Sequence, residues 1–214
     1  MARVRGGWTA LIPLRDLSGG KTRLAAKLGA AERRALTEFA AEAVVQSCLG
    51  APSVARTVVV TASPAVAAWA KTQGAAVWEE PAGCSGLAPA MQAAAAAFAS
   101  GPGGVVMLMG DLPLLRAGAL ERWLARAAAT EAAFAPSAAG SGTNLLTLAP
   151  GCAMELSFGA TDSLARHRRS ARAAGLRYRT IACPGAALDV DEPADLERLS
   201  RSPAVRTALP FLGR

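Results

Sequence analysis

Three aspartates form the pattern with the clearest chemical meaning. Asp111 follows the apolar run VVMLM at 105–109, and Asp189 and Asp191 stand one residue apart in the segment LDVDEP. Two residues at alternate positions of an extended segment point the same way. Carboxylates placed rigidly after a buried strand suit a hard cation that bridges nucleotide phosphates. We therefore predict a metal site here, although Asp111 could cap a turn and Asp191 could cap the last helix.

A glycine-containing loop, LRDLSGGKTRL at 14–24, offers a second kind of chemistry. Glycines let backbone N–H groups approach a phosphate closely, and the cations of Lys21 and Arg23 would neutralise its charge. The loop is not a P-loop, because Arg15 stands where that motif needs its first glycine. The segment predicts a phosphate-binding loop, and the alternative is a solvated turn with ordinary surface charges.

Two further loops carry hydroxyl groups. The segment GSGTN at 140–144 enters a predicted strand, and FGATDS at 158–163 leads into a helix that starts near Ser163. The N–H groups at a helix start favour an anion. His167, the only histidine, lies on this arginine-rich helix, and we interpret it as structural rather than catalytic.

These loops must be positioned by the strands and helices between them. Short β-like runs alternate with longer helical patterns along the chain. Such alternation predicts an α/β fold with a mostly parallel sheet and helices on both faces. Ligands bind such sheets at the carboxyl ends of the strands. Strands are predicted at 8–13, 57–61, 75–78, 105–109, 132–135, 145–148 and 178–182. Helices are predicted at 30–49, from Ser63-Pro64 onward, and at 88–99, 118–129, 162–174 and 193–200.

Composition narrows the function classes. Hydrophobic residues make up 52% and charged residues 18%, which excludes a disordered chain. The basic start, Met1 to Arg5, precedes an apolar run too short for a signal peptide, so a buried strand and a cytoplasmic location are expected. No apolar stretch reaches the roughly 20 residues that span a bilayer. The four cysteines form no C-x-x-C pair, and Cys48 is expected to pack in the core, whereas Cys84 could be a reactive loop thiol.

The net charge of +7 favours anionic partners. Aromatic residues are only 5% and form no cluster suited to base stacking, so small phosphates are favoured over nucleic acid. Alanine-rich helix faces are compatible with a homodimer.

In order and spacing, the segments ALIPLRDLSGGKTRL, TVVVTASP, GDLPLL, GTNLL, FGATDSLARH and LDVDEPADL resemble the 2-phospho-L-lactate guanylyltransferase family of coenzyme F420 synthesis. The resemblance covers about residues 8 to 200. The D-x-P and DVD-x-P segments also occur in the wider MobA-like nucleotidyltransferases, whereas the G-T-N and F-G…S…H segments are more specific.

The resemblance implies one nucleotidyltransferase domain over 1–214, with a core at 8–200 and a tail at 201–214. It implies a three-layer α/β/α fold of the nucleotide-diphospho-sugar transferase type. It also implies an enzyme that uses GTP and Mg²⁺, with two ions expected. Such enzymes join GMP to 2-phospho-L-lactate, phosphoenolpyruvate or 3-phospho-D-glycerate and release pyrophosphate.

Roles carried over by motif follow the loops described above. The implied catalytic set is Asp111, Asp189, Asp191 and Lys21, with the three aspartates as metal ligands. The implied nucleotide-binding residues are Arg15, Lys21, Arg23, Thr61 and Gly86, and the implied acid-binding residues are Thr143, Gly159 and Ser163.

The chain departs from the family pattern at Ala88, where an asparagine usually follows Gly86-Leu87. An amide that could contact the nucleotide is therefore missing. Alternatives stay open: a nucleotidyltransferase for a sugar phosphate or a molybdopterin cofactor, a retaining-type glycosyltransferase, or a nucleotide-binding protein without activity.

Overall fold

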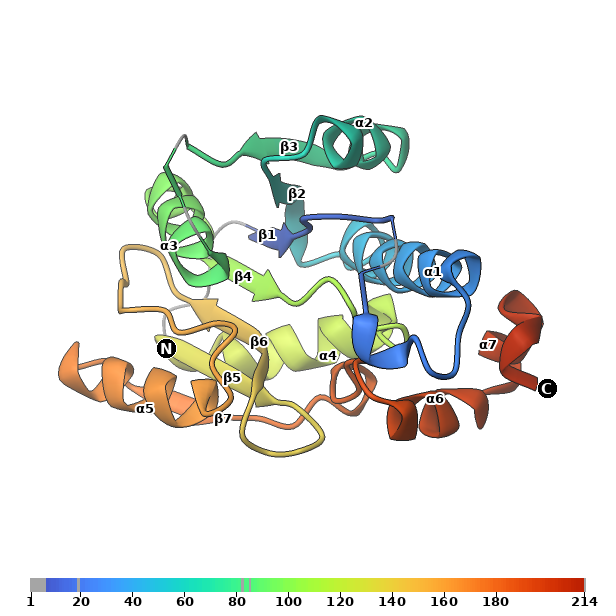
Figure 1. Cartoon of the computed structure of the whole chain (residues 1–214). Coiled ribbons are helices and arrows are strands. Elements are labelled where there is room, and N and C mark those ends of the chain that lie inside the picture. The colour runs from blue at the N-terminus through green and yellow to red at the C-terminus, as the bar shows by residue number, and fades with distance from the viewer. Residues whose placement is uncertain (1–6, 19, 82, 85, 214) are drawn as a thin grey trace.

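The computed structural model describes residues 7–18, 20–81, 83–84 and 86–213, and its centre is one seven-stranded sheet with helices on both faces (Figure 1). The strands are β1 (Trp8–Pro13), β2 (Val54–Thr61), β3 (Ala76–Glu79), β4 (Val105–Leu108), β5 (Ala132–Pro136), β6 (Thr143–Leu148) and β7 (Tyr178–Thr180). The helices are α1 (Ala30–Leu49), α2 (Pro64–Thr72), α3 (Leu87–Phe98), α4 (Ala117–Ala127), α5 (Ser163–Ala173), α6 (Pro193–Ser200) and α7 (Pro203–Ala208). Short 3-10 helices are η1 (Thr22–Leu24), η2 (Pro184–Ala186) and η3 (Pro210–Gly213).

The strand order is β3-β2-β1-β4-β6-β5-β7, and every neighbouring pair is parallel except those that include β6. The predicted α/β fold with a mostly parallel sheet is therefore confirmed. Because β6 runs antiparallel to β4, it begins where β4 ends, with Leu145 opposite Leu108. The first residues of β6 therefore lie at the same sheet edge as the carboxyl ends of the parallel strands.

The alternation of side chains along each strand builds two apolar layers. Val59 and Val106 pack with α1, α2 and α4 on one face, and Val58 and Met107 pack with α3 and α5 on the other. Successive residues of a strand point to opposite faces, so continuous apolar runs are what a sheet covered on both sides requires. The result is the three-layer α/β/α arrangement that the sequence predicts.

A third apolar cluster joins the two ends of the chain. Leu24 and Leu28 from the first loop pack with Leu36 of α1 and with Val190 and Val205 near the C-terminus. Figure 1 shows α6 and α7 beside the start of α1. The tail at 201–213 thus docks on the body of the protein, and the segments that carry Lys21 and Asp191 are fixed next to each other.

Strand boundaries differ from the prediction by more than one residue at three strands. β2 begins at Val54 rather than at 57, because Ala55 and Arg56 are exposed at a strand start that pairs only through the backbone. β6 begins two residues early, at Thr143, and β7 ends at Thr180 rather than at 182. Within the described ranges, none of the helices has the length and apolar character needed to cross a membrane.

Candidate functional site

Asp111 lies just beyond β4, on a turn that only glycine can form there. A Cβ on Gly110 would come within 2.3 Å of the Leu14 side chain and 3.0 Å of the Pro13 carbonyl. Such separations are below van der Waals contact, so any side chain would push the turn away from the end of β1. Gly110 therefore lets the Asp111 backbone pack directly against the segment that leads into the first loop.

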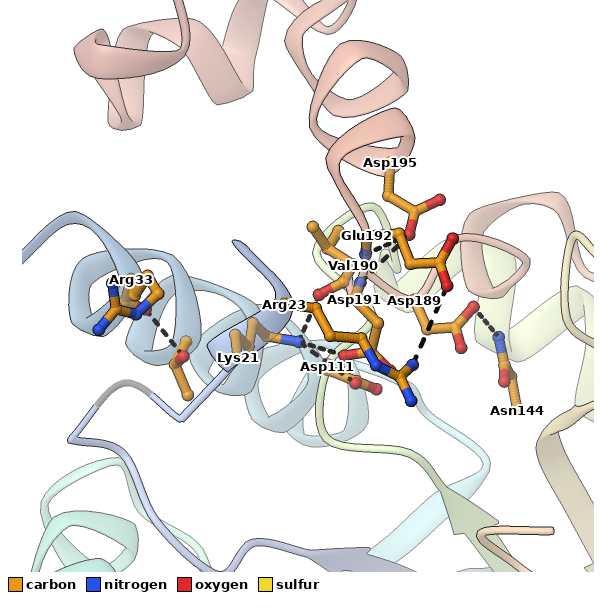
Figure 2. Close-up of polar contacts among 11 residues, drawn as sticks. Lys21, Arg23, Arg33, Asp111, Asn144, Asp189, Val190, Asp191, Glu192 and Asp195 are labelled. Carbon is orange, nitrogen blue, oxygen red and sulfur yellow. Dashed lines mark hydrogen bonds and ion pairs between the residues drawn. The ribbon is translucent and has the colours of Figure 1, made fainter. Parts of the chain in front are cut away.

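Lys21 reaches into the space beside Asp111 from that first loop (Figure 2). Its ammonium donates to the Val190 carbonyl at 2.6 Å, to Asp191 Oδ1 at 3.2 Å and to Asp111 Oδ2 at 3.4 Å. The side chain is only 8% exposed. Its backbone has φ 26°, in the left-handed region where non-glycine residues pay a strain cost. The fold thus holds this one cation against two carboxylates.

The segment 188–195 presents its two aspartates as the alternate spacing predicts. Val190 points into the third apolar cluster, while Asp191 meets Lys21 and Asp189 Oδ1 accepts from the Asn144 amide at 3.4 Å. Figure 2 shows Asp111 and Asp191 beside the Lys21 ammonium, and Asp189 beside Asn144. Asp191 does not cap α6, because the Asp195 carboxylate accepts the N–H groups of Asp191 and Glu192.

Burial raises the pKa of Asp111 above its ordinary value, Lys21 opposes this, and the charges of Asp191 and Asp189 add to the rise. Within the described part of the chain, Asp111 Oδ1 is the one buried side-chain oxygen or nitrogen without a hydrogen-bond partner. An unpartnered buried carboxylate oxygen costs free energy unless a donor or a cation reaches it. This buried oxygen therefore keeps an acceptor capacity that no group of the described chain uses.

The aspartates do not by themselves form a preformed metal cage. Among the described residues, no three histidine, cysteine, aspartate or glutamate side chains are grouped as metal ligands. The ammonium of Lys21 pairs with Asp111 and Asp191 at the position that a metal ion would otherwise occupy. A metal ion bound between Asp111 Oδ2 and Asp191 Oδ1 would have to displace the Lys21 ammonium, whereas Asp111 Oδ1 is not paired with it.

The remaining residues of the predicted nucleotide site lie in the first loop and at strand ends. Arg23 is exposed and pairs with Glu192 at 4.0 Å, and Arg15 is exposed just beyond β1. Thr61 ends β2, where its buried hydroxyl accepts from the Ser63 N–H. Ser63 caps α2 and Pro64 occupies its first turn, as the sequence predicts. Gly19 of the predicted phosphate-binding loop lies outside the described residues.

The two candidate glycines meet at the start of α3. Gly86 precedes α3 with φ 113°, and Gly159 has φ 87°, so both adopt a conformation that L side chains rarely reach. A Cβ on Gly159 would lie 3.7 Å from Leu87 Cδ2. The turn at 158–160 therefore packs on the loop that begins α3, and the structure brings these two predicted loops together.

Thr143 and Ser163 form a second, buried polar group with His167. The Thr143 N–H donates to Ser163 Oγ at 3.0 Å, and His167 Nδ1 lies 3.0 Å from Thr143 Oγ1. The Ser157 N–H donates to His167 Nε2 at 2.9 Å. Burial lowers the pKa of His167 to about 4, so the imidazole is neutral at physiological pH. The structural interpretation of His167 agrees with this environment.

The start of α5 lies at Ser163, as predicted, but its backbone is less open to an anion than the sequence suggests. The N–H groups of Ser163 and Leu164 already donate to the carbonyls of Ala160 and Ser141. The carboxylate of Asp162 stands directly before them and pairs with Arg166. Anion binding here must therefore use the hydroxyl groups.

The sequence analysis included Asn144 in the GSGTN loop without assigning it a role, and it missed Asp195. Asn144 is buried, and its amide donates to the Ala186 carbonyl at 2.9 Å and weakly to Asp189. Asp195 holds the turn that presents Asp191. The signals were available, since an amide at a strand start and an aspartate in the first turn of a helix often satisfy backbone groups. Cys48 is buried, as predicted, and burial raises the pKa of its thiol.

Comparison with solved structures supports the fold class. A Desulfovibrio desulfuricans protein described as a candidate nucleotide-diphospho-sugar transferase matches with a TM-score of 0.77 and 17% identity, over 97% of this chain and 94% of that one. A Mycobacterium tuberculosis protein solved in complex with manganese matches with a TM-score of 0.54 and 20% identity, over 92% and 99%. The fold is therefore the one found in nucleotide-diphospho-sugar transferases.

Residues 8–202 match the model of one family, described as guanylyl transferase CofC like, and the chain belongs to it. A phosphoenolpyruvate guanylyltransferase of Conexibacter woesei is 35% identical over 89% of this chain and 86% of its own length. A 3-phospho-D-glycerate guanylyltransferase of Phenylobacterium zucineum is 36% identical over 92% and 91%. The resemblance predicted from the motifs is confirmed.

Proposed function

We propose that this guanylyltransferase joins GMP from GTP to a small phosphorylated carboxylic acid and releases pyrophosphate, as a step in coenzyme F420 synthesis. Relatives named for phosphoenolpyruvate and for 3-phospho-D-glycerate support an acceptor of this class. The observation that carries the proposal is the Lys21–Asp111–Asp191 cluster at the carboxyl edge of the sheet. The strand β6, which begins with Thr143, starts at the same edge, and the Thr143 N–H donates to Ser163 Oγ.

The chain's own residues fit an in-line transfer. A phosphate oxygen of the acid forms a bond to the α-phosphorus of GTP, and the bond from that phosphorus to the bridging oxygen of the β-phosphate breaks. The acid's phosphate is already ionised, so no general base is needed. Lys21, with Arg23 and Arg15 at the rim, is placed to bind the negative charge that develops on pyrophosphate.

The carboxylates fit a divalent cation by their chemistry. Asp111, Asp189 and Asp191 supply hard oxygen ligands, and the open Oδ1 of Asp111 supplies one that the protein leaves unpaired. These residues would hold Mg²⁺, which would neutralise phosphate charge and align the reacting groups. The manganese complex of a structural neighbour supports a divalent cation in this fold. We propose that Lys21 then turns from Asp111 and Asp191 toward the triphosphate.

The nucleotide loop and the acid loop are proposed on the two sides of this cluster. Thr61 and Gly86 stand at strand and helix ends facing the sheet edge, where a guanosine would lie. Thr143, Gly159 and Ser163 would bind the acid. Because Ala88 lacks the amide usual in the family, we expect recognition of guanine to depend more on the backbone of this loop.

We further propose that the chain acts as one domain, since strands from both halves enter one sheet. The cytoplasm, where GTP is available, is the proposed location. A homodimer remains a proposal that rests on alanine-rich helix faces, and sedimentation of the purified chain would test it.

The decisive experiment is pyrophosphate release with GTP and Mg²⁺, and with phosphoenolpyruvate, 3-phospho-D-glycerate or 2-phospho-L-lactate in turn. ATP and CTP replace GTP as controls, and manganese replaces magnesium in a parallel series. Release with GTP and one acid is the expected result and would identify the acceptor. Equal release with all three nucleotides would contradict the GTP assignment, and no release with any acid would contradict the acceptor class.

A further inference from the structure

The only histidine of the chain lies inside the protein rather than in the open part of the site. His167, on α5, has no exposed surface, and its ring stacks on Phe134 with centroids 6.0 Å apart. The edge of Phe158 approaches the same ring at 4.9 Å. Aromatic contacts on two sides fix the plane of the imidazole, so its two nitrogens point in set directions.

The hydrogen bonds to those nitrogens determine which one carries the proton. The Ser157 backbone N–H lies 2.9 Å from Nε2, and a backbone N–H can only donate. Nε2 must therefore be an acceptor without hydrogen. Because burial keeps His167 neutral, its single ring proton is on Nδ1, which faces Thr143 Oγ1 at 3.0 Å. His167 thus donates to the Thr143 hydroxyl and does not accept from it.

The hydroxyl oxygen of Ser163, like that of Thr143, accepts a hydrogen bond from the protein. Ser163 Oγ accepts from the Thr143 N–H at 3.0 Å, so the protein supplies a donor to the oxygen of both hydroxyls. Within the described ranges, no protein acceptor pairs with the hydrogen of either hydroxyl. The hydroxyl groups of Thr143 and Ser163 therefore each keep a hydrogen that they can donate to a ligand.

An anion needs donors, and the backbone here offers few. The first N–H groups of α5 are already bonded to loop carbonyls, and Asp162 adds a negative charge nearby. A hydroxyl that pointed its oxygen at a phosphate or carboxylate would repel it. Fixed hydroxyl donors reverse that effect and form charge-assisted hydrogen bonds.

We propose that His167 is a positioning residue that holds Thr143 as a hydrogen-bond donor to the phosphorylated acid, by donating from Nδ1 to Thr143 Oγ1. The inference rests on the proposed function for the identity of the acid, but not for the state of the imidazole. His167 does not touch the acid, and its effect passes through the Thr143 hydroxyl.

The tautomer can be measured without any substrate. Because His167 is the sole histidine, nitrogen NMR of the full chain, labelled in histidine and without a histidine tag, gives one imidazole to assign. The expected spectrum at neutral pH has a protonated, pyrrole-type Nδ1 and an unprotonated Nε2. A protonated Nε2, or a charged ring, would overturn the inference directly.

Two substitutions separate the bond to Thr143 from the bond to Ser157. The amide of asparagine in His167→Asn falls near the position of Nδ1 and can donate to Thr143. The longer side chain in His167→Gln reaches the position of Nε2 and can accept from Ser157. His167→Phe keeps an aromatic ring between Phe134 and Phe158 but removes both hydrogen bonds.

The measured quantities are KM for phosphoenolpyruvate, or for whichever acid the wild type accepts, and KM for GTP. We expect His167→Phe and His167→Gln to raise the KM for the acid about 10- to 100-fold, the scale of one hydrogen bond to a charged group. His167→Asn should stay within about threefold of the wild type, and the KM for GTP should hardly change in any variant. The reverse order, with His167→Gln active and His167→Asn impaired, would show that His167 only supports the Ser157 loop.

A double substitution tests whether the effect passes through the hydroxyl. Thr143→Val removes the hydroxyl and keeps the shape, so adding His167→Phe to it should raise the KM for the acid no further. Independent, additive losses would contradict the inference. A wild type that turns over no acid would instead defeat the proposed function, and the NMR spectrum would still decide the tautomer, so the two failures are distinguishable.

Discussion

The two polar groups of this site are built on opposite principles. The carboxylate cluster, Lys21 with Asp111 and Asp191, is charged, and it is partly open, since the Asp191 side chain is 50% exposed and Asp111 keeps an unpaired oxygen. The hydroxyl cluster, Thr143 and Ser163 with His167, is neutral and buried, and the oxygen of each hydroxyl already accepts a bond. Charge is thus kept at the cluster where we propose that cations and phosphates bind, and fixed neutral donors stand where we propose that the acid is oriented.

The clusters also differ in how the chain assembles them. Lys21 is 90 residues from Asp111 and 170 from Asp191, so the carboxylate cluster exists only when both chain ends have docked through the third apolar cluster. Thr143 is only 20 residues from Ser163 and 24 from His167. The hydroxyl cluster therefore forms within one β-strand, its following loop and one helix. We expect changes in the first to alter turnover and changes in the second to alter stability and acid affinity.

The largest effect is expected at Asp111. Asp111→Asn keeps the shape of the side chain but removes the charge that we propose binds the cation, so kcat should fall by about 10²-fold or more. The melting temperature should be unchanged or higher, because burial disfavours the charged form of this carboxyl. Steady-state kinetics measure kcat, and thermal unfolding of the same preparation measures the melting temperature.

The matched control for that variant is Glu131→Gln, a carboxylate paired with Arg177 beside the start of β5. It should keep full turnover. Near-normal kcat in Asp111→Asn would end the metal assignment for this residue.

The next effect is a pH dependence of stability that His167 supplies. Its pKa is about 4 in the folded protein, against an ordinary value of 6.5. Between these pH values the unfolded chain therefore binds more protons than the folded chain. The contribution of His167 to the free energy of unfolding is fully present above about pH 6.5, and it is lost as the pH falls toward 4. The loss should reach at most about 3 kcal/mol. Denaturant unfolding of the wild type and of His167→Asn, from pH 4.5 to 7.5, isolates this contribution from that of the carboxylates.

In that comparison the wild type should lose stability relative to the variant as the pH falls. Parallel curves for the two proteins would mean that His167 is not held neutral by burial. The Asp162→Asn variant, which changes an exposed carboxylate directly before the same helix, serves as the control.

The sequence predicted the layout of this molecule well because the sheet is covered on both faces. Strands such as 105–109 must then be continuously apolar, and the residues that follow them must lie at one edge. Motif order supplied the family, which residues 8–202 confirm. The antiparallel course of β6 was not predictable from its own residues, yet it places Thr143 at the carboxyl edge of the parallel strands.

What could not be predicted are contacts between distant parts of the chain. The aspartates suggested a metal cage, but the position of the Lys21 ammonium between Asp111 and Asp191 depends on the docking of both chain ends. Likewise, the pattern S…H on an arginine-rich helix gave no indication that His167 would face Thr143. Periodicity reports which face of a helix is buried, and it does not report which polar group lies beneath it.

A smaller effect is expected when Lys21 is replaced by a neutral side chain of similar length. In Lys21→Met, Asp111 and Asp191 lose their internal cation, so Mg²⁺ should bind the nucleotide-free protein about tenfold more tightly, or about 1.4 kcal/mol. Turnover should still fall, because the triphosphate loses a cation. Calorimetric titration with Mg²⁺ measures the affinity, and Lys71→Met on the distant helix α2 is the control. Weaker Mg²⁺ binding in Lys21→Met would show that the lysine does not compete with the metal.

The smallest effect is expected at the rim, where Arg23 and Glu192 pair at 4.0 Å with side chains 72% and 66% exposed. Such a pair contributes little to folding, so Glu192→Gln should change the free energy of unfolding by less than about 0.5 kcal/mol. If Arg23 binds the triphosphate, releasing it from Glu192 should lower the KM for GTP modestly, by about twofold, and the gain should shrink as salt screens the exposed charges. Arg23→Gln should raise that KM, while Arg34→Gln, which breaks an exposed pair on α1, should leave it unchanged. An unchanged KM for GTP in both Glu192→Gln and Arg23→Gln would confine nucleotide binding to the carboxylate cluster and exclude the rim.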